Sequence, residues 1–320
     1  MIPSIDLAPF RVGGDANRRR VAEQVDAACR QVGFFTVVGH GVDTDLVLRA
    51  WSAGQRFFSE ELAVKSAVAM PEPGYPYGYS PVEGEALSYS LGTGGLPDLK
   101  ESYVIGPIDA SDRALDDMAD PDERAVYAPN LWPATDGFRV AWEEYYRAMS
   151  ALAGTLMQVF AQALGLGDDF FQPLIDRHGS AMRMLHYPHQ ASPPPPGQLR
   201  AGAHTDYGTL TILAQDVAPG GLQVRNTAGD WVPVPHEPGA FVVNLGDLMA
   251  RWTNDRWRST LHRVVNPSTG GGSNDRFSIA FFHNANWDAL VTCLTDGDEP
   301  KYPPIRAGAH LMGKFRSTVI

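Results

Sequence analysis

Residues 201–214 read AGAHTDYGTLTILA, and they join a small polar segment to a short apolar run that is rich in β-branched residues. The run at 209–214 is typical of a strand. Further strands of similar length are expected at 181–187, 222–225, 231–234, 240–244, 262–265, 277–282 and 289–293. Many short strands separated by turn residues indicate a sandwich, a jelly roll or a barrel.

The N-terminal part of the chain has a different pattern, which mixes helix and strand. Residues 2–7 and 34–38 predict strands, and the apolar spacing over 15–32 predicts a helix that Gly33 ends. Asp43 can cap a second helix, which 60–67 continue, and longer helical patterns cover 136–166 and 168–178. We therefore expect a mixed α/β region at 1–178 and a mainly β part at 179–320 that closes with a helix at 304–317.

Residues 70–98 are rich in proline and glycine and predict a long irregular loop. The loop carries Tyr75, Tyr77, Tyr79 and Tyr89. Loops of this length are often functional, and tyrosines favour ordered packing. Two interpretations follow: the loop covers a substrate, or its rings lie against the edge of the core.

The composition excludes several classes of protein. The 320 residues carry a formal net charge of −11, which disfavours nucleic acid and anionic membranes as partners. Two cysteines, Cys29 and Cys293, rule out a disulfide scaffold and a cysteine-based metal site. No secretory signal or membrane span is visible, so we expect a cytoplasmic protein, either a monomer or a weak homodimer.

The segment His204-Thr205-Asp206 carries the sharpest chemical signal. In an extended segment residues i and i+2 point to the same side, so the imidazole and the carboxylate can converge on one ion. His262 follows on another expected strand. Two histidines and one carboxylate form the facial arrangement typical of non-haem Fe(II) oxygenases, with three positions left open. The alternative is a buried His–Asp pair and an unrelated histidine.

A second pattern, Arg276-Phe277-Ser278, places a guanidinium and a hydroxyl on one side of a strand. Together they suit a carboxylate, so an anionic chelator held there could reach a metal at the triad. The alternative is an ordinary solvated strand face.

These motifs occur together with others in one order along nearly the whole chain. They are Ile5-Asp6-Leu7, Gly33-Phe34-Phe35, Gly39-His40-Gly41, Leu99-Lys100-Glu101-Ser102-Tyr103, Asn130-Leu131-Trp132-Pro133, Tyr187-Pro188, His204-Thr205-Asp206-Tyr207-Gly208-Thr209-Leu210-Thr211, Gly221-Leu222-Gln223-Val224, Asn244-Leu245-Gly246-Asp247, Leu261-His262-Arg263-Val264, and Arg276-Phe277-Ser278 before Phe281-Phe282. In this set the chain resembles the isopenicillin N synthase-like branch of the iron(II)/2-oxoglutarate-dependent dioxygenases.

The resemblance implies a double-stranded β-helix, or jelly roll, with helices packed around it. It implies that His204, Asp206 and His262 bind Fe(II), and that Arg276 and Ser278 hold the distal carboxylate of 2-oxoglutarate. Tyr187 matches a tyrosine that also contacts the cosubstrate. Where many plant relatives have an asparagine two positions before this tyrosine, the chain has Leu185. Residues 270–274 lengthen the segment between His262 and Arg276, which suggests a longer hairpin loop.

The implied function is oxidation of an aliphatic C–H of a small molecule by O2, with release of succinate and CO2. Hydroxylation, desaturation and cyclisation all remain open. Two alternatives remain: an Fe(II)-dependent oxidase that uses no 2-oxoglutarate, and a non-catalytic jelly roll that binds a small carboxylate. We expect an amino-acid-derived or secondary metabolite as substrate. Its expected lining is the tyrosine loop, Met249, Arg251, Phe282, His283 and the last helix, while Asn244 and Gln223 could support a ligating imidazole.

Overall fold

Strands dominate the part of the chain around the expected site. The computed structural model describes residues 2–72, 74–88, 92, 95–109, 115, 118–218, 220–267, 273–295 and 297–316. The strands are β1 (Ser4–Asp6), β2 (Phe34–Val38), β3 (Gly78–Ser80), β4 (Glu101–Ile105), β5 (Ala181–Tyr187), β6 (Ala201–His204), β7 (Leu210–Gln215), β8 (Leu222–Arg225), β9 (Trp231–Pro233), β10 (Phe241–Leu245), β11 (His262–Val264), β12 (Arg276–His283), β13 (Leu290–Val291) and β14 (Ile305–Arg306).

Helices flank these strands and are concentrated in the first half of the chain. They are α1 (Ala8–Val12), α2 (Asp15–Gln31), α3 (Thr44–Ser59), α4 (Leu62–Ser66), α5 (Pro121–Val126), α6 (Phe138–Ala163), α7 (Gln172–Ile175), α8 (Asp247–Trp252) and α9 (Ala307–Arg316). Among the described residues, no helix is both long and apolar enough to cross a membrane.

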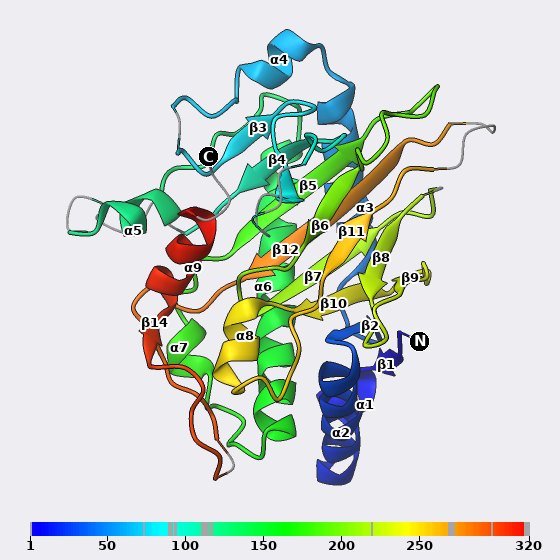
Figure 1. Ribbon diagram of the computed structural model, residues 1–320. Helices are drawn as coiled ribbons and strands as arrows, with labels where there is room; N and C mark the ends of the chain where they lie inside the picture. Colours follow the sequence, from blue (N-terminus) through cyan, green and yellow to red (C-terminus); the bar gives the residue numbers. More distant parts are fainter. Residues whose placement is uncertain are drawn as a thin grey trace.

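Two sheets lie face to face (Figure 1). The larger sheet has the order β1-β2-β10-β7-β12-β5-β4-β3, and the smaller has the order β6-β11-β8-β9. An apolar cluster joins their facing sides, with Leu222 and Val264 from the smaller sheet and Leu185, Val242 and Ala280 from the larger. The mainly β core with flanking helices confirms the predicted fold class. Strands from residues 1–178 and from 179–320 share the larger sheet.

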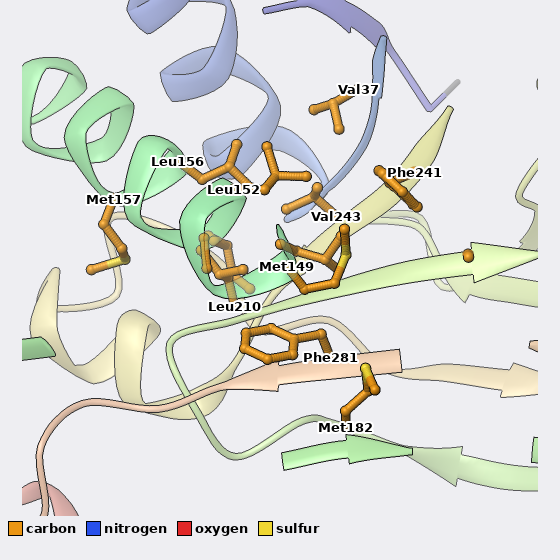
Figure 2. Packing of buried hydrophobic residues seen from close by; sticks show 14 of the residues in the cluster. Val37, Met149, Leu152, Leu156, Met157, Met182, Leu210, Phe241, Val243 and Phe281 are labelled. Carbon is orange, nitrogen blue, oxygen red and sulfur yellow. The ribbon is translucent and has the colours of Figure 1, made fainter. Parts of the chain in front are cut away.

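The outer face of the larger sheet is covered by α6, the longest helix (Figure 1). Its apolar side chains repeat every three or four residues, so Met149, Leu152 and Leu156 fall on one face. Figure 2 shows this face against Val243 and Phe281 of the sheet. Each large apolar side chain buried there contributes about 1.5–3 kcal/mol relative to an exposed one. The main core therefore supports the outer face of the larger sheet. The inner face of the same sheet carries the candidate site residues.

Several sequence predictions of local structure are wrong. Glu60 and Glu61 are extended, so α4 is a separate helix and does not continue α3. The helix expected at 168–178 shrinks to α7, which begins where Pro173 can occupy one of its first two positions. The predicted loop at 70–98 contains β3, and β4 and β6 were not predicted. Tyr77 and Tyr79 are buried, whereas Tyr89 and 268–272 lie outside the described residues.

Gly33 gives a test of how the helical layer joins the sheet. Its φ of +70° lies in the left-handed region, and an added Cβ would lie 2.1 Å from the backbone oxygen of Arg258. Gly33→Ala is therefore expected to lower the free energy of unfolding by about 2–4 kcal/mol. Gly154→Ala is the matched control, because Gly154 has open space in helix α6. It should raise stability by about 1 kcal/mol. Urea unfolding measures both, and equal effects would contradict the account.

Candidate metal centre and cosubstrate pocket

The two candidate histidines face each other across neighbouring strands. His204 ends β6 and pairs directly with His262 at the start of β11, and their ring centroids are 4.2 Å apart. Asp206 lies in the turn after β6, with Oδ1 3.9 Å from His204 Nε2 and 3.7 Å from His262 Nε2. One ligand atom from each of the three residues lies within 4.8 Å of the others. The three donors predicted from the sequence therefore converge.

Hydrogen bonds to backbone carbonyls orient both imidazoles. His204 Nδ1 lies 2.8 Å from the carbonyl oxygen of Gly202, and His262 Nδ1 lies 3.1 Å from that of Thr260. An Nδ1–H that donates to a carbonyl leaves Nε2 with a free lone pair. Both Nε2 atoms are the ones that face Asp206. The backbone thus selects the tautomer that a metal ligand needs.

The carboxylate of Asp206 is held from the other side by the large sheet. Its Oδ2 accepts hydrogen bonds from Asn244 Nδ2 at 2.7 Å and from Thr211 Oγ1 at 2.5 Å. These two donors are register partners on β10 and β7. Asn244 therefore supports the carboxylate, whereas the sequence suggested that it supports an imidazole. Gln223, the other candidate, accepts a hydrogen bond from Arg263.

The electrostatics favour the ligand forms of these groups. Burial lowers the pKa of His204 to about 4, and the nearby His262 acts in the same direction. Burial acts to raise the pKa of Asp206, but the two histidines and the two hydrogen bonds outweigh it, so the pKa of Asp206 is lowered. A neutral imidazole beside an ionised carboxylate is the pair that binds a divalent cation.

Arg276 and Ser278 lie on the inner face of β12, as the alternation of the strand predicts. Arg276 pairs with Tyr187 across β5, and its guanidinium carbon lies 5.0 Å from the centre of the tyrosine ring. The arginine is 1% exposed. Its Nη2 donates to Gln215, but its buried Nη1 has no hydrogen-bond partner within the described part of the chain. An unpaired buried donor of this kind fits an anion.

A second buried arginine, Arg200, was not predicted from the sequence. It directly precedes β6, is fully buried, and donates from Nη2 to the backbone oxygen of Asn274. Its guanidinium carbon lies 6.0 Å from the ring of Tyr187. Burial and the charge of Arg276 lower its pKa to about 10. No strand pattern marks residues 200–204, so only the three-dimensional structure places this cation beside Arg276.

The residues of the triad and those around Arg276 have the chemistry of the groups that the resemblance implies. Two imidazoles and one carboxylate match the facial triad of non-haem Fe(II) enzymes. The unpaired Nη1 of Arg276 and the nearby Arg200 match a dianionic cosubstrate. Both groups therefore fit the residues that are present.

Comparisons with known proteins agree with a site for Fe(II) and 2-oxoglutarate. A family model described as the 2OG-Fe(II) oxygenase superfamily matches residues 178–285, and one described as the non-haem dioxygenase in morphine synthesis N-terminal region matches 2–135. The 2-oxoglutarate-Fe(II) type oxidoreductase hxnY of Emericella nidulans is 36% identical, over 99% of this chain and 90% of the relative.

The chain belongs to the 2OG-Fe(II) oxygenase superfamily.

Two further similarities extend this result. Validamycin A dioxygenase of Streptomyces hygroscopicus subsp. limoneus is 33% identical, over 98% of this chain and 85% of the relative. The crystal structure of a full-length Neurospora crassa protein in complex with alpha-KG and thymine has a TM-score of 0.85 and 30% identity, over 99% of this chain and 97% of that one. The protein is thus an Fe(II)- and 2-oxoglutarate-dependent dioxygenase that uses O2, with a jelly-roll core. The names of these relatives favour this assignment over the two alternatives, an oxidase that uses no 2-oxoglutarate and a non-catalytic jelly roll.

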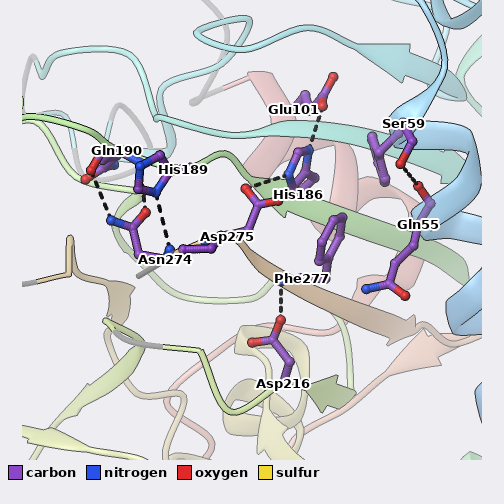
Figure 3. Close-up of polar contacts among 12 residues, drawn as sticks. Gln55, Ser59, Glu101, His186, His189, Gln190, Asp216, Asn274, Asp275 and Phe277 are labelled. Atoms are coloured by element: carbon purple, nitrogen blue, oxygen red, sulfur yellow. Dashed lines mark hydrogen bonds and ion pairs between the residues drawn. The ribbon is translucent and has the colours of Figure 1, made fainter. Parts of the chain in front are cut away.

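Other histidines of the dioxygenase point away from the triad. His186 lies on the outer face of β5, with Nδ1 2.7 Å from Glu101 Oε1, and it stacks on Phe277 at 4.3 Å (Figure 3). His189 accepts a hydrogen bond from the backbone N–H of Asn274. His283 is buried on the outer side of β12, where Thr209 Oγ1 lies 2.7 Å from its Nδ1. The rings of His186 and His283 therefore lie on the outer face of the larger sheet, away from the triad.

The residues expected to line the substrate do not lie together in the structure. Phe282 packs on the inner apolar cluster between the two sheets. Met249 is fully buried in the main core, and His283 is buried on the outer side, so neither lines the inner face. Arg251 lines a cavity of about 670 Å³ beside α8, whose walls include Asp247 and Lys314 but none of the triad. Its walls also include Thr260, whose carbonyl lies behind His262, so the cavity adjoins the triad from outside.

Proposed function

We propose that His204, Asp206 and His262 bind the Fe(II) of this dioxygenase. The observation that carries the proposal is the convergence of one ligand atom from each residue within 4.8 Å. The two carbonyl acceptors behind the imidazoles and the two donors behind the carboxylate support it, because metal ligands in proteins are usually oriented in this way. We also propose that Arg276 and Ser278 hold the distal carboxylate of 2-oxoglutarate and that Tyr187 contacts the cosubstrate, which the buried, unpaired Nη1 of Arg276 beside the Tyr187 ring supports.

Each of these residues has a definite part in the reaction. Iron(II) supplies the activation of O2 that couples oxidation of a substrate C–H to the conversion of 2-oxoglutarate into succinate and CO2. Arg276 fixes one end of the cosubstrate by a charge-assisted hydrogen bond, and the ring of Tyr187 limits its position from the side. The apolar cluster around Leu185 and Ala280 excludes water from the space between the sheets.

The proposed reaction is oxidation of an aliphatic C–H in a small molecule, of the amino-acid-derived or secondary-metabolite kind. Similarity to a dioxygenase named for validamycin A and to a structure that holds thymine supports a small organic substrate. Hydroxylation, desaturation and cyclisation differ in the product formed. We also propose the division into an N-terminal region at 1–178 and a catalytic core at 179–320, which the family-model matches at 2–135 and 178–285 support.

A screen of candidate substrates with Fe(II), 2-oxoglutarate and O2 tests this function. The expected result is one succinate for each product molecule. Mass spectrometry of the product shows a gain of one oxygen atom for hydroxylation, or a loss of two hydrogen atoms for desaturation or cyclisation. Product without succinate, or product that forms equally well after removal of iron with a chelator, would contradict the proposal.

Asn244→Ala tests the support behind the carboxylate ligand. The variant removes one of the two hydrogen bonds to Asp206 and leaves the three proposed ligands in place. Loss of a group that holds a metal ligand typically lowers metal affinity by about 10- to 100-fold. Calorimetric titration with Fe(II) under anaerobic conditions measures the change in metal affinity. The exposed Asn17 of α2 provides the control, Asn17→Ala, which should bind iron as the unaltered protein does.

A further inference from the structure

A cavity of about 670 Å³ opens beside α8, and it is lined by none of the residues proposed to bind iron or 2-oxoglutarate. Its walls come mainly from the end of β8, from α8, from the segment between α8 and β11, and from α9. Ligand sites in proteins usually have volumes of about 300–1,000 Å³. The cavity is therefore large enough to hold a small organic molecule.

The acidic side chains that the structure describes in the wall of this cavity already have cationic partners. Asp247 Oδ2 lies 2.6 Å from Lys314 Nζ, and it accepts a hydrogen bond from Thr205 Oγ1 at 3.1 Å. Asp255 Oδ2 lies 3.1 Å from Lys301 Nζ. The charges of the two carboxylates are therefore balanced by the two lysines and not by the arginines of the wall.

Three arginines in the same wall have no carboxylate partner within the described ranges of the chain. Each donates one N–H to a neutral backbone carbonyl, Arg225 to that of Gly229, Arg251 to that of Pro303 and Arg258 to that of Arg30. A backbone carbonyl satisfies one donor but does not neutralise the charge. Three positive charges are therefore left uncompensated around one cavity.

The remaining nitrogen atoms of these guanidinium groups are accessible to a ligand. Arg225 and Arg258 are exposed, and both Nη atoms of each lack hydrogen bonds to described residues. Arg251 is half-buried, and its Nη1 also lacks such a bond but is not one of the buried polar atoms without a partner. Each arginine therefore offers at least one nitrogen donor toward the cavity or the solvent.

The positive character of the cavity contrasts with the protein as a whole, whose formal net charge is −11. Cations gathered around a concave surface focus the electrostatic potential and attract anions. Guanidinium groups pair with carboxylates through two parallel hydrogen bonds. Val32, Ala250 and Leu261 add apolar contacts in the same wall, which suit a hydrocarbon chain. These features together match an organic molecule that carries several carboxylates.

We propose that this cavity is a second ligand site, which binds a small polycarboxylate through Arg225, Arg251 and Arg258. Two or three carboxylates of one molecule pair with the three guanidinium groups. A neutral molecule of the same shape would leave these charges unpaired, and a cation would be repelled. The inference goes beyond the proposed function, because this site shares no residue with the iron and cosubstrate sites.

Propane-1,2,3-tricarboxylate and its neutral triamide are the two probes of this site. Each is titrated by calorimetry into the anaerobic enzyme saturated with Fe(II) and 2-oxoglutarate, so that the Arg276 pocket is occupied. One tricarboxylate should bind per chain, at least about tenfold tighter than the triamide. Arg251→Gln and Arg258→Gln should each weaken its binding by about 10- to 100-fold, the usual effect of losing a hydrogen bond to a charged group.

Arg306→Gln is the matched control for these variants. Arg306 also donates to a backbone carbonyl, that of Asp288, but it does not line the cavity. Its replacement should leave the affinity for the tricarboxylate unchanged. Thermal unfolding of each variant checks that the protein is folded. Three results would each overturn the inference: no binding of the tricarboxylate, equal binding of the triamide, or unaltered affinity in both Arg251→Gln and Arg258→Gln.

The visible charge-transfer band of a 2-oxo acid chelated to Fe(II) is recorded during the same titrations. The band should persist when the tricarboxylate binds, because the two sites are separate. Loss of the band, together with binding that Arg276→Gln abolishes and Arg258→Gln does not, would place the probe in the cosubstrate pocket and overturn the inference. A band that is missing before any probe is added would contradict the proposed function and not the second site.

Discussion

Asp206→Ala is expected to lower substrate-dependent succinate formation by more than about 100-fold, beyond the effect of losing a group that only supports a ligand. Two imidazoles remain, but the facial set loses its only carboxylate. The variant also leaves the donors of Asn244 and Thr211 without their acceptor, which costs about 1–3 kcal/mol of stability. Succinate assays and thermal unfolding measure the two effects separately.

The control for this variant is Asp169→Ala, at an exposed aspartate far along the chain from the triad. It should keep full turnover. Asp206→Asn helps to separate folding from metal binding, because the amide keeps the shape of the side chain but is a much poorer ligand. A folded Asp206→Ala protein that retains iron and turnover would exclude Asp206 as a ligand.

Arg276→Gln is expected to raise the KM for 2-oxoglutarate by about 10- to 100-fold, the range expected for the loss of a charge-assisted hydrogen bond. The rate at saturating cosubstrate should change less, because the iron ligands are untouched. The KM of Arg276→Lys for 2-oxoglutarate should lie between the values of the unaltered enzyme and Arg276→Gln. An ammonium group keeps the charge but loses the planar pair of donors. Steady-state succinate assays over a range of 2-oxoglutarate concentrations measure the change.

Arg263→Gln is the matched control for the cosubstrate anchor. Arg263 lies next to His262 in β11, but it stacks on Trp231 and bonds Gln223. Its replacement should leave the KM for 2-oxoglutarate within about twofold, because the effect of an arginine on a bound anion requires direct contact. An unchanged KM in Arg276→Gln, or an equal rise in Arg263→Gln, would contradict the assignment.

The strands that the sequence predicted well are those with short, largely apolar runs. β5, β7, β10 and β12 bury side chains on both faces, so their segments contain β-branched and aromatic residues. β6 was missed because Ala201–His204 consists of small residues and one histidine. β4 was missed because its polar residues, Glu101 and Ser102, are buried by hydrogen bonds with His186 and Arg183. Such tertiary partners leave no local signal.

The three metal-binding candidates taken from the sequence converge in the structure, but they do so across two strands and a connecting segment. His204 and Asp206 were expected on one extended segment, whereas β6 ends at His204 and Asp206 lies in the turn that leads from the smaller sheet to the larger. The spacing of the motif therefore reflects a crossing between sheets. Arg200 could not be predicted, because its partner is far away in the sequence.

Anaerobic titration of Fe(II) with and without 2-oxoglutarate is the most direct test of the central claim, that the triad holds iron beside the Arg276 pocket. The account predicts a visible charge-transfer band that saturates at one iron and one 2-oxoglutarate per chain. The band should be absent in His204→Ala, Asp206→Ala and His262→Ala, and it should require more cosubstrate in Arg276→Gln. A band of unaltered intensity in the triad variants would place the iron elsewhere and contradict the account.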